Sequence, residues 1–293
     1  MRRLIVNADD FGMTRGINRA IVEASSHGIV TSTTLMVTAR AFDDAVTLAP
    51  TVSSRVSVGC HVIFLDGTPV LPPDRIPSLL QPSPNGAARE FRIKLPDFAR
   101  AALTGKLNSM EIEAEAAAQI DRLQRAGISP SHIDCHKHAH MFPPVLCPLL
   151  RAAESRGVPA IRNPFGRLVP LPFTRILRNP KHWRRVAELG VLRAYSTRFK
   201  TQAAAHGLRT PDGCVGVVHT GTLDIESFLV IIDTLPDGTW EFVCHPGYND
   251  AELDQVRTRL RQSRATELSL LTWPDARSAL DRRGIQLITF RDL

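Results

Sequence analysis

Short apolar runs alternate with amphipathic stretches along most of the chain, as they do in parallel β/α units. The first apolar run, Leu4 to Val6, has the length of a buried strand, and residues 16–24 have the apolar spacing of a helix. This alternation predicts an α/β fold with a parallel sheet. Further strands are predicted at residues 30–37, 56–62, 131–136, 160–162, 215–218, 240–244 and 285–290, and further helices at 41–48, 109–126, 144–155, 225–233 and 274–283.

Residues 66–86 interrupt this alternation with many prolines and glycines, which predict a long irregular loop. A loop of this length in a compact domain usually serves as a lid or a binding loop. The chain shows neither an internal repeat nor a domain linker. Because 293 residues suit an α/β barrel, we expect residues 1–293 to form one TIM-like (β/α) barrel domain with loop and helical insertions.

The composition is that of a globular protein, with 43% hydrophobic and 22% charged residues. No run of 18 apolar residues occurs, and Met1-Arg2-Arg3 leads straight into the first strand. We therefore expect neither an export signal nor a membrane span, which makes the cytoplasm the default location. The five cysteines are an odd number without metal-binding spacing, so a disulfide framework is not expected.

The net charge of +7 is concentrated in one segment of the chain. Residues 162–200 contain ten lysines and arginines and a single acid, Glu188, a local balance of +9 that leaves −2 for the remainder. A uniformly basic nucleic-acid-binding protein is therefore not indicated. Phenylalanine, leucine and tryptophan lie among these basic residues, and we call residues 163–200 the basic insert.

Polar side chains gather where the predicted strands end. In a barrel of parallel strands these ends open onto one face, where active sites are built. A lone histidine at such a position is more often structural than functional, but recurrence at successive strand ends favours a common site. The residues concerned are Asp9, Asp10, His61, the stretch 134–140, His219 and His245.

Asp9 and Asp10 are adjacent carboxylates directly after the first apolar run. Two ionised carboxylates at close range repel each other, and a cation would remove this conflict, with one group as ligand and the other as base. The alternative is a pair that caps the following helix. Asp10, His61 and one histidine of residues 136–140 would supply a carboxylate and two imidazoles, leaving positions open for water and substrate.

These groups together suit the hydrolysis of an amide or an ester. A bound metal would lower the pKa of its water and polarise a carbonyl, while Asp9 would act as base and His245 as the acid for the leaving group. The chain has no G-x-S-x-G elbow, P-loop, H-E-x-x-H motif or dinucleotide fingerprint. Carboxylate and imidazole ligands suit zinc, manganese, cobalt, nickel or iron, and magnesium with more waters.

The polar segments, in their order along the chain, resemble motifs of the YdjC-like carbohydrate deacetylases. The resemblance implies a distorted (β/α) barrel that removes N-acetyl groups from amino sugars with one divalent metal ion, zinc or magnesium in first place. The matching segments are Asn-Ala-Asp-Asp-Phe-Gly at 7–12, Gly-Cys-His at 59–61, His-Ile-Asp-Cys-His-Lys-His-Ala-His at 132–140 and Cys-His-Pro-Gly at 244–247.

The resemblance also implies roles for single residues, carried over by position. Asp9 resembles the general base, and His245 resembles the general acid. Asp10, His61 and His136 resemble the three metal ligands.

The choice of His136 as a ligand, instead of His138 or His140, rests on the resemblance alone, because the spacing does not distinguish them. His138, His140 and Arg162 are candidates for contact with the substrate. Non-catalytic binding of a sugar or an anion by the same barrel remains an alternative function.

Within the family, the chain is most similar to the branch associated with hopanoid biosynthesis, often labelled HpnK. This resemblance implies deacetylation of an N-acetylglucosaminyl group on a hopanoid lipid at the inner face of the membrane. The basic insert, 163–200, would then lie on anionic headgroups. In the alternative, the insert is a lid or a homodimer arm packed on the barrel, and the substrate is a soluble chitooligosaccharide of the diacetylchitobiose type.

Overall fold

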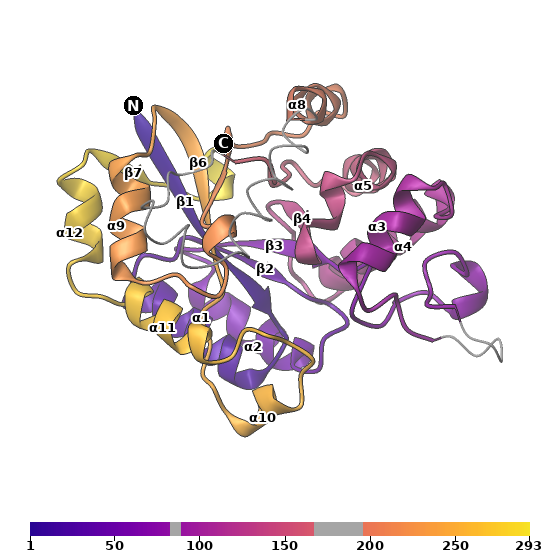
Figure 1. Ribbon diagram of the computed structural model, residues 1–293, viewed down its shortest axis with the longest axis horizontal. Coiled ribbons are helices and arrows are strands. Elements are labelled where there is room, and N and C mark those ends of the chain that lie inside the picture. The colour runs from indigo at the N-terminus through magenta and orange to yellow at the C-terminus, as the bar shows by residue number, and fades with distance from the viewer. Residues whose placement is uncertain (83–88, 167–195) are drawn as a thin grey trace.

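The computed structural model describes residues 1–82, 89–166 and 196–293, and a curled parallel sheet lies at its centre (Figure 1). The long strand β1 pairs with β2, β6 and β7, and the order along the sheet is β4-β3-β2-β1-β6-β5. The strands are β1 (Arg2–Phe11), β2 (Ser32–Leu35), β3 (Ser57–Val62), β4 (Ile133–Cys135), β5 (Gly213–Val215), β6 (Gly238–Cys244) and β7 (Ile285–Leu287).

The sheet curls into a half-barrel and does not close. Its two edge strands, β4 and β5, are only three residues long. Between them the chain makes isolated bridges, from Ile161 to Ile133 and from Ala160 to Arg209, where the sequence predicted a strand. The predicted TIM-like barrel is therefore confirmed as a barrel-like α/β fold but not as a closed barrel, because short ladders cannot join the two edges.

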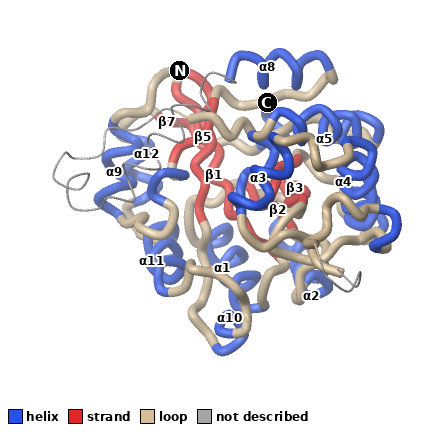
Figure 2. Tube along the Cα trace, turned by 45° about the vertical axis from the view of Figure 1, so that its right-hand side comes forward, coloured by secondary structure: helices blue, strands red, loops and turns tan. Residues whose placement is uncertain are grey.

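Helices surround the strands on the outside (Figure 2). In Figure 1, α3, α4, α5 and α8 lie on one side of the sheet, and α1, α2 and α9 to α12 lie on the other. The helices are α1 (Arg15–Ser26), α2 (Phe42–Val52), α3 (Leu95–Leu103), α4 (Ser109–Arg125), α5 (Pro143–Ser155), α8 (Ser196–Ala205), α9 (Ile225–Asp233), α10 (Ala251–Asp254), α11 (Gln262–Leu271) and α12 (Ala276–Asp281). Single 3-10 turns are η1 (Pro73–Arg75), η2 (His136–Met141), η3 (Val217–His219) and η4 (Phe290–Asp292).

Several elements differ from their predicted extent. The strand predicted at 215–218 ends at Val215, because Gly216 adopts a left-handed backbone with φ 91° and starts a 3-10 turn. Helix α2 continues through Pro50 to Val52, although it was predicted to end at Leu48. Helices α3, α8, α10 and α11 were not predicted. Residues 167–195 of the basic insert lie outside the described residues.

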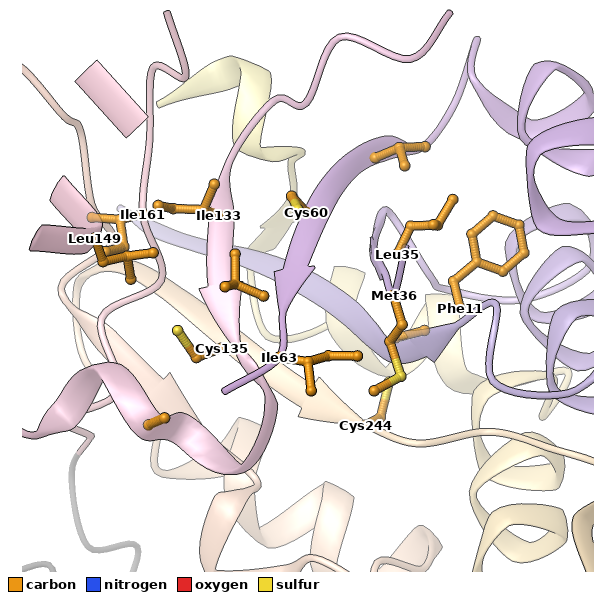
Figure 3. Packing of buried hydrophobic residues seen from close by; sticks show 14 of the residues in the cluster. Phe11, Leu35, Met36, Cys60, Ile63, Ile133, Cys135, Leu149, Ile161 and Cys244 are labelled. Atoms are coloured by element: carbon orange, nitrogen blue, oxygen red, sulfur yellow. The ribbon is translucent and has the colours of Figure 1, made fainter. Parts of the chain in front are cut away.

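The main hydrophobic cluster fills the space between the sheet and the helices (Figure 3). Phe11 and Leu35 contribute from β1 and β2, and Ile133, Leu149 and Ile161 contribute from the β4 side. All five side chains are 0% exposed. Burial of a large apolar side chain stabilises a fold by about 1.5–3 kcal/mol, so this layer holds the strands in place.

Alternation along β1 decides which of its side chains reach the candidate site. Leu4 and Val6 belong to the main cluster, whereas Ile5 belongs to a small separate cluster. Because side chains alternate along a strand, Asn7 and Asp9 follow Ile5 on its face. This face therefore carries polar side chains toward the carboxyl end of β1. Among the described helices, none combines the length and apolar character that crossing a membrane requires.

Candidate metal centre and active site

Three predicted metal ligands converge at the carboxyl ends of strands. Asp10 lies near the end of β1, His61 near the end of β3, and His136 directly after β4. Asp10 Oδ1 is 3.7 Å from His61 Nε2 and 3.6 Å from His136 Nδ1. These separations exceed a hydrogen bond, and one ion that binds nitrogen and oxygen at about 2.0–2.2 Å can reach all three atoms. The structure therefore brings together the set that the sequence predicted.

An irregularity in β1 places both adjacent aspartates in one site. The pairing of β1 with β2 shifts register between Ala8 and Phe11. Within this shift, Asp10 has a left-handed backbone with φ 71°. A bulge of this kind re-aims a side chain that regular alternation would send to the opposite face. Asp9 and Asp10 are consequently both buried here, with 3% and 2% exposure.

The helix-capping alternative for the aspartate pair does not hold. Thr14 is the N-cap residue of α1, and its hydroxyl accepts a hydrogen bond from the Ile17 N–H at 3.1 Å. Asn18 Oδ1 accepts the Gly12 N–H at 2.7 Å, which fixes the turn after Asp10. Both carboxylates therefore remain available to the site.

The donor set fits a divalent cation. Asp10 Oδ1 is buried and has no hydrogen-bond partner in the described part of the chain. His61 Nδ1 is bound to Asp134 Oδ1 at 2.7 Å, which leaves His61 Nε2 to face Asp10. An acidic partner of this kind orients a ligating imidazole. Burial lowers the pKa of His61, but the neighbouring carboxylates outweigh it and raise the pKa to about 9, so a proton supplies positive charge where a metal would.

Among the described residues, buried carboxyl groups outnumber buried arginines around the site. Burial raises the pKa of Glu241 and of Glu267 to about 7, so this surplus favours the binding of a cation where these two groups are ionised. The carboxyl groups are those of Asp9, Asp10, Asp134, Glu241 and Glu267, and the guanidinium groups are those of Arg162 and Arg264.

Asp9 is held by Arg162. The guanidinium donates two hydrogen bonds to the Asp9 carboxylate, at 2.6 and 2.9 Å, and a third to Glu241 Oε1 at 2.7 Å. It also forms an ion pair with Asp134. Burial alone would raise the pKa of Asp9, but Arg162, together with His61 and His245, outweighs burial and holds this pKa far below the ordinary range. Asp9 is thus an oriented, ionised carboxylate, as a general base must be.

Arg162 itself is 0% exposed beneath Asp9. Its contact with the substrate stays a prediction, and in the structure its guanidinium contacts three carboxylates of the protein. The physical reason is the cost of burying acids without a partner, which one guanidinium relieves for all three.

His245 lies in the loop after β6, with Nε2 3.8 Å from Asp9 Oδ2. Its backbone N–H donates to Glu267 Oε2 of α11 at 2.6 Å. Burial lowers the pKa of His245 to about 4, so the imidazole is neutral at pH 7. His245 can therefore act as an acid in a reaction only after it has taken up a proton at the site.

The other two histidines of the cluster take different positions. Lys137 and His138 both have left-handed backbones, with φ 52° and 54°, so the chain reverses directly after His136. His138 has a pKa lowered to about 3 by burial, and its Nδ1 is buried without a hydrogen-bond partner. His140 is 0% exposed, and its ring centroid lies 6.2 Å from that of Phe199 in α8. His138 thus faces the charged groups, and His140 packs into the core.

Three charged residues of the site, Glu241, Arg264 and Glu267, were not predicted from the sequence. Glu241 left a signal, because it is a lone acid inside the apolar run of β6. Arg264 and Glu267 left none, because α11 carries buried charges on its inner face and shows no helical apolar stripe. Asp134 was noted only as a polar residue at a strand end, and its bond to His61 is a tertiary contact.

The fold and the site define a barrel-like α/β protein with a two-histidine, one-carboxylate candidate metal centre beside a second buried aspartate, Asp9. The sequence profile described as YdjC-like protein matches residues 3–282. The chain therefore belongs to the YdjC-like family.

Known relatives resemble the chain over nearly its whole length. A carbohydrate deacetylase of Brevibacillus brevis is 32% identical over 292 residues, covering 99% of each chain. A carbohydrate deacetylase of Geobacillus stearothermophilus is 32% identical over 294 residues, covering 99% of this chain and 98% of the relative. A crystal structure from Enterococcus faecalis, described as a candidate cellobiose-phosphate cleavage protein, is 26% identical with a TM-score of 0.77, covering 99% and 98% of the two chains.

Proposed function

We propose that this protein is a metal-dependent hydrolase that removes the N-acetyl group from an amino-sugar conjugate. The observation that carries the proposal is the ionised, arginine-held Asp9 beside Asp10, whose Oδ1 faces two imidazoles without a hydrogen bond. A site that only bound a ligand would need no spare carboxylate beside its metal ligand. The carbohydrate deacetylases among the relatives support the substrate class.

Asp10, His61 and His136 would hold one divalent ion, with zinc or magnesium in first place and manganese, cobalt, nickel or iron as further candidates. When bound, such an ion lowers the pKa of water and polarises a carbonyl oxygen. Two imidazole nitrogens favour the transition-metal ions over magnesium, which prefers oxygen ligands.

Asp9 and His245 carry out the proton transfers in this proposal. Asp9 accepts a proton from the water that attacks the acetyl carbon, and Arg162 keeps its carboxylate in place. His245, whose Nε2 lies 3.8 Å from Asp9 Oδ2, receives that proton in this proposal and delivers it to the leaving nitrogen. The new C–O bond forms first, and the amide C–N bond then breaks as its nitrogen takes up the proton, which yields acetate and a free amino sugar.

We propose that the N-acetylated sugar is attached to a hopanoid lipid, and that the protein acts on this glycolipid at the inner face of the membrane. The support is the composition of the basic insert, 163–200, whose positive charge and apolar residues suit an anionic lipid surface. A soluble chitooligosaccharide is the second candidate, because the carbohydrate deacetylases match the chain over its whole length.

The test is acetate release from an N-acetylglucosaminyl lipid and from diacetylchitobiose, each after chelation and after metal is added back. We expect Asp9→Asn to retain metal and to lose about 10²–10⁴-fold in turnover, because it removes the base. Asp10→Ala should lose both metal and turnover.

Asp275→Asn is the matched control, because Asp275 is exposed and makes no capping hydrogen bond in α12. Wild-type turnover in Asp9→Asn would refute the role of the base. Release from diacetylchitobiose alone would refute the lipid substrate, and metal-independent release would refute the metal centre.

A further inference from the structure

Arg264 is a buried charge that the proton transfers above do not use. It lies in α11, is 1% exposed, and donates through Nη2 to Asp10 Oδ2 at 2.5 Å. A guanidinium in the interior is costly unless it is paired, so this contact is the condition under which Arg264 can be buried.

Two further contacts hold Arg264, whose Nη1 is buried without a hydrogen-bond partner among the described residues. Nε donates to the Leu260 carbonyl oxygen at 3.2 Å, and the Arg264 carbonyl oxygen accepts the Gly247 N–H at 3.2 Å. A Cβ atom on Gly247 would lie 2.9 Å from Arg264 Cδ, so only glycine allows this approach of the loop that carries His245. The guanidinium therefore has a defined position relative to the strand ends.

Arg264 makes the two oxygens of the Asp10 carboxylate different from each other. Oδ2 is occupied by the guanidinium, while Oδ1 has no hydrogen bond in the described structure and lies 3.6 and 3.7 Å from the imidazoles of His136 and His61. We infer that Arg264 is a positioning residue that holds Asp10 so that it binds the divalent cation through Oδ1 alone. This inference rests on the proposed metal centre.

A single carboxylate oxygen with two imidazole nitrogens defines the class of ion. Calcium takes six to eight oxygen ligands and often a bidentate carboxylate, which the occupied Oδ2 does not offer. Zinc, cobalt and related ions accept three protein ligands of mixed nitrogen and oxygen and keep open positions. Arg264 thus acts on the cation through Asp10, without touching it.

If Arg264 only neutralised the charge of the buried carboxylates, its substitution would change the metal affinity in the opposite direction. Removing a positive charge beside a cation site strengthens the attraction for the cation. Removing a positioning residue weakens binding, because substitution of such partners typically costs about 10–100-fold in metal affinity. The sign of the change therefore separates the two roles.

The experiment titrates the chelator-stripped full chain with Zn²⁺ and Co²⁺ against a chromophoric chelator. We expect Arg264→Met to weaken both ions about 10–100-fold and to change the visible spectrum of bound Co²⁺, which reports coordination geometry. Arg264→Lys keeps the charge but loses the planar guanidinium group, and we expect it to bind both ions at least several-fold more weakly. Arg156→Met is the control for loss of an arginine, because Arg156, directly after α5, forms a partly exposed ion pair with Asp121 of α4.

If the wild-type chain binds metal and Arg264→Met binds it equally or more tightly, the positioning role is refuted. If Arg264→Met does not fold, Arg264→Lys decides, because charge neutralisation alone predicts unchanged affinity when the charge is kept. Absence of binding by the wild-type chain would instead refute the proposed metal centre. A circular dichroism spectrum of each metal-free variant confirms that the fold is retained.

Discussion

Glu241 offers a quantitative test of the electrostatics beneath the site. It is 0% exposed in β6, where Oε1 accepts a hydrogen bond from Arg162 and Oε2 has no partner among the described residues. Burial raises the pKa of Glu241 to about 7 from an ordinary 4.5, and Arg162 only partly opposes this. Between about pH 4.5 and pH 7, the folded protein therefore keeps a proton on Glu241 that the unfolded chain releases.

The substitution Glu241→Gln mimics the protonated group and removes its titration. The pKa rises from 4.5 to about 7 on folding, and at about 1.4 kcal/mol per pKa unit this shift is worth about 3 kcal/mol. Because the folded pKa is the higher one, stability is fully present below about pH 4.5 and is lost as the pH rises to 7. We expect Glu241→Gln to match wild type near pH 4.5 and to exceed its stability by up to about 3 kcal/mol above pH 7.

The assay is urea unfolding of chelator-treated protein at pH 5 and pH 8.5, with the free energy of unfolding extrapolated to water. Glu90→Gln is the control, since Glu90 is exposed and its substitution should give no pH-dependent difference. A loss of stability in Glu241→Gln of the same size at both pH values would refute the reasoning. It would show that Arg162 needs the Glu241 charge at every pH, and not only its oxygen.

Two further substitutions test how the site is supported. Asn18→Ala removes the acceptor for the Gly12 N–H and the donor to the Ala41 carbonyl, which lie at 2.7 and 3.1 Å. We expect a loss of about 1–3 kcal/mol in urea unfolding and weaker metal binding, and unchanged metal affinity would show that this turn does not position the ligand. Gly59→Ala would place a Cβ 2.5 Å from the ring of His132, which is stacked at 3.6 Å on Phe290. We expect about 1–3 kcal/mol of destabilisation in thermal unfolding, and an unchanged melting temperature would show that the ring can move aside.

Local sequence patterns predicted much of the fold and the members of the candidate metal centre. Helix α9 begins and ends where the apolar spacing predicted, and α4 ends one residue earlier than predicted. Asp10 and His61 were found because short apolar runs end at them, and carboxyl ends of parallel strands meet at one edge. Such patterns are local, with a period of two or 3.6 residues, and are therefore readable along the chain.

Backbone details that depend on neighbouring strands could not be read in this way. The bulge that turns Asp10 toward Asp9 exists only in the pairing of β1 with β2. The reversal at Lys137 and His138 selects His136 for the site, and spacing alone gave no reason for that choice. A distorted TIM-like barrel was expected from the alternation of strands and helices and from the length, whereas closure depends on the ladders at β4 and β5.

The sequence by itself therefore determined the alternating α/β architecture and the polar strand ends that form the site. Tertiary structure alone decided how the buried charges are paired. Arg162 reaches Asp9 across 153 residues of sequence, and Arg264 reaches Asp10 across 254. No local period connects such partners. Their pairing follows from the energetic cost of leaving a charge unpaired in a dry interior, and this cost arises only when the chain has folded.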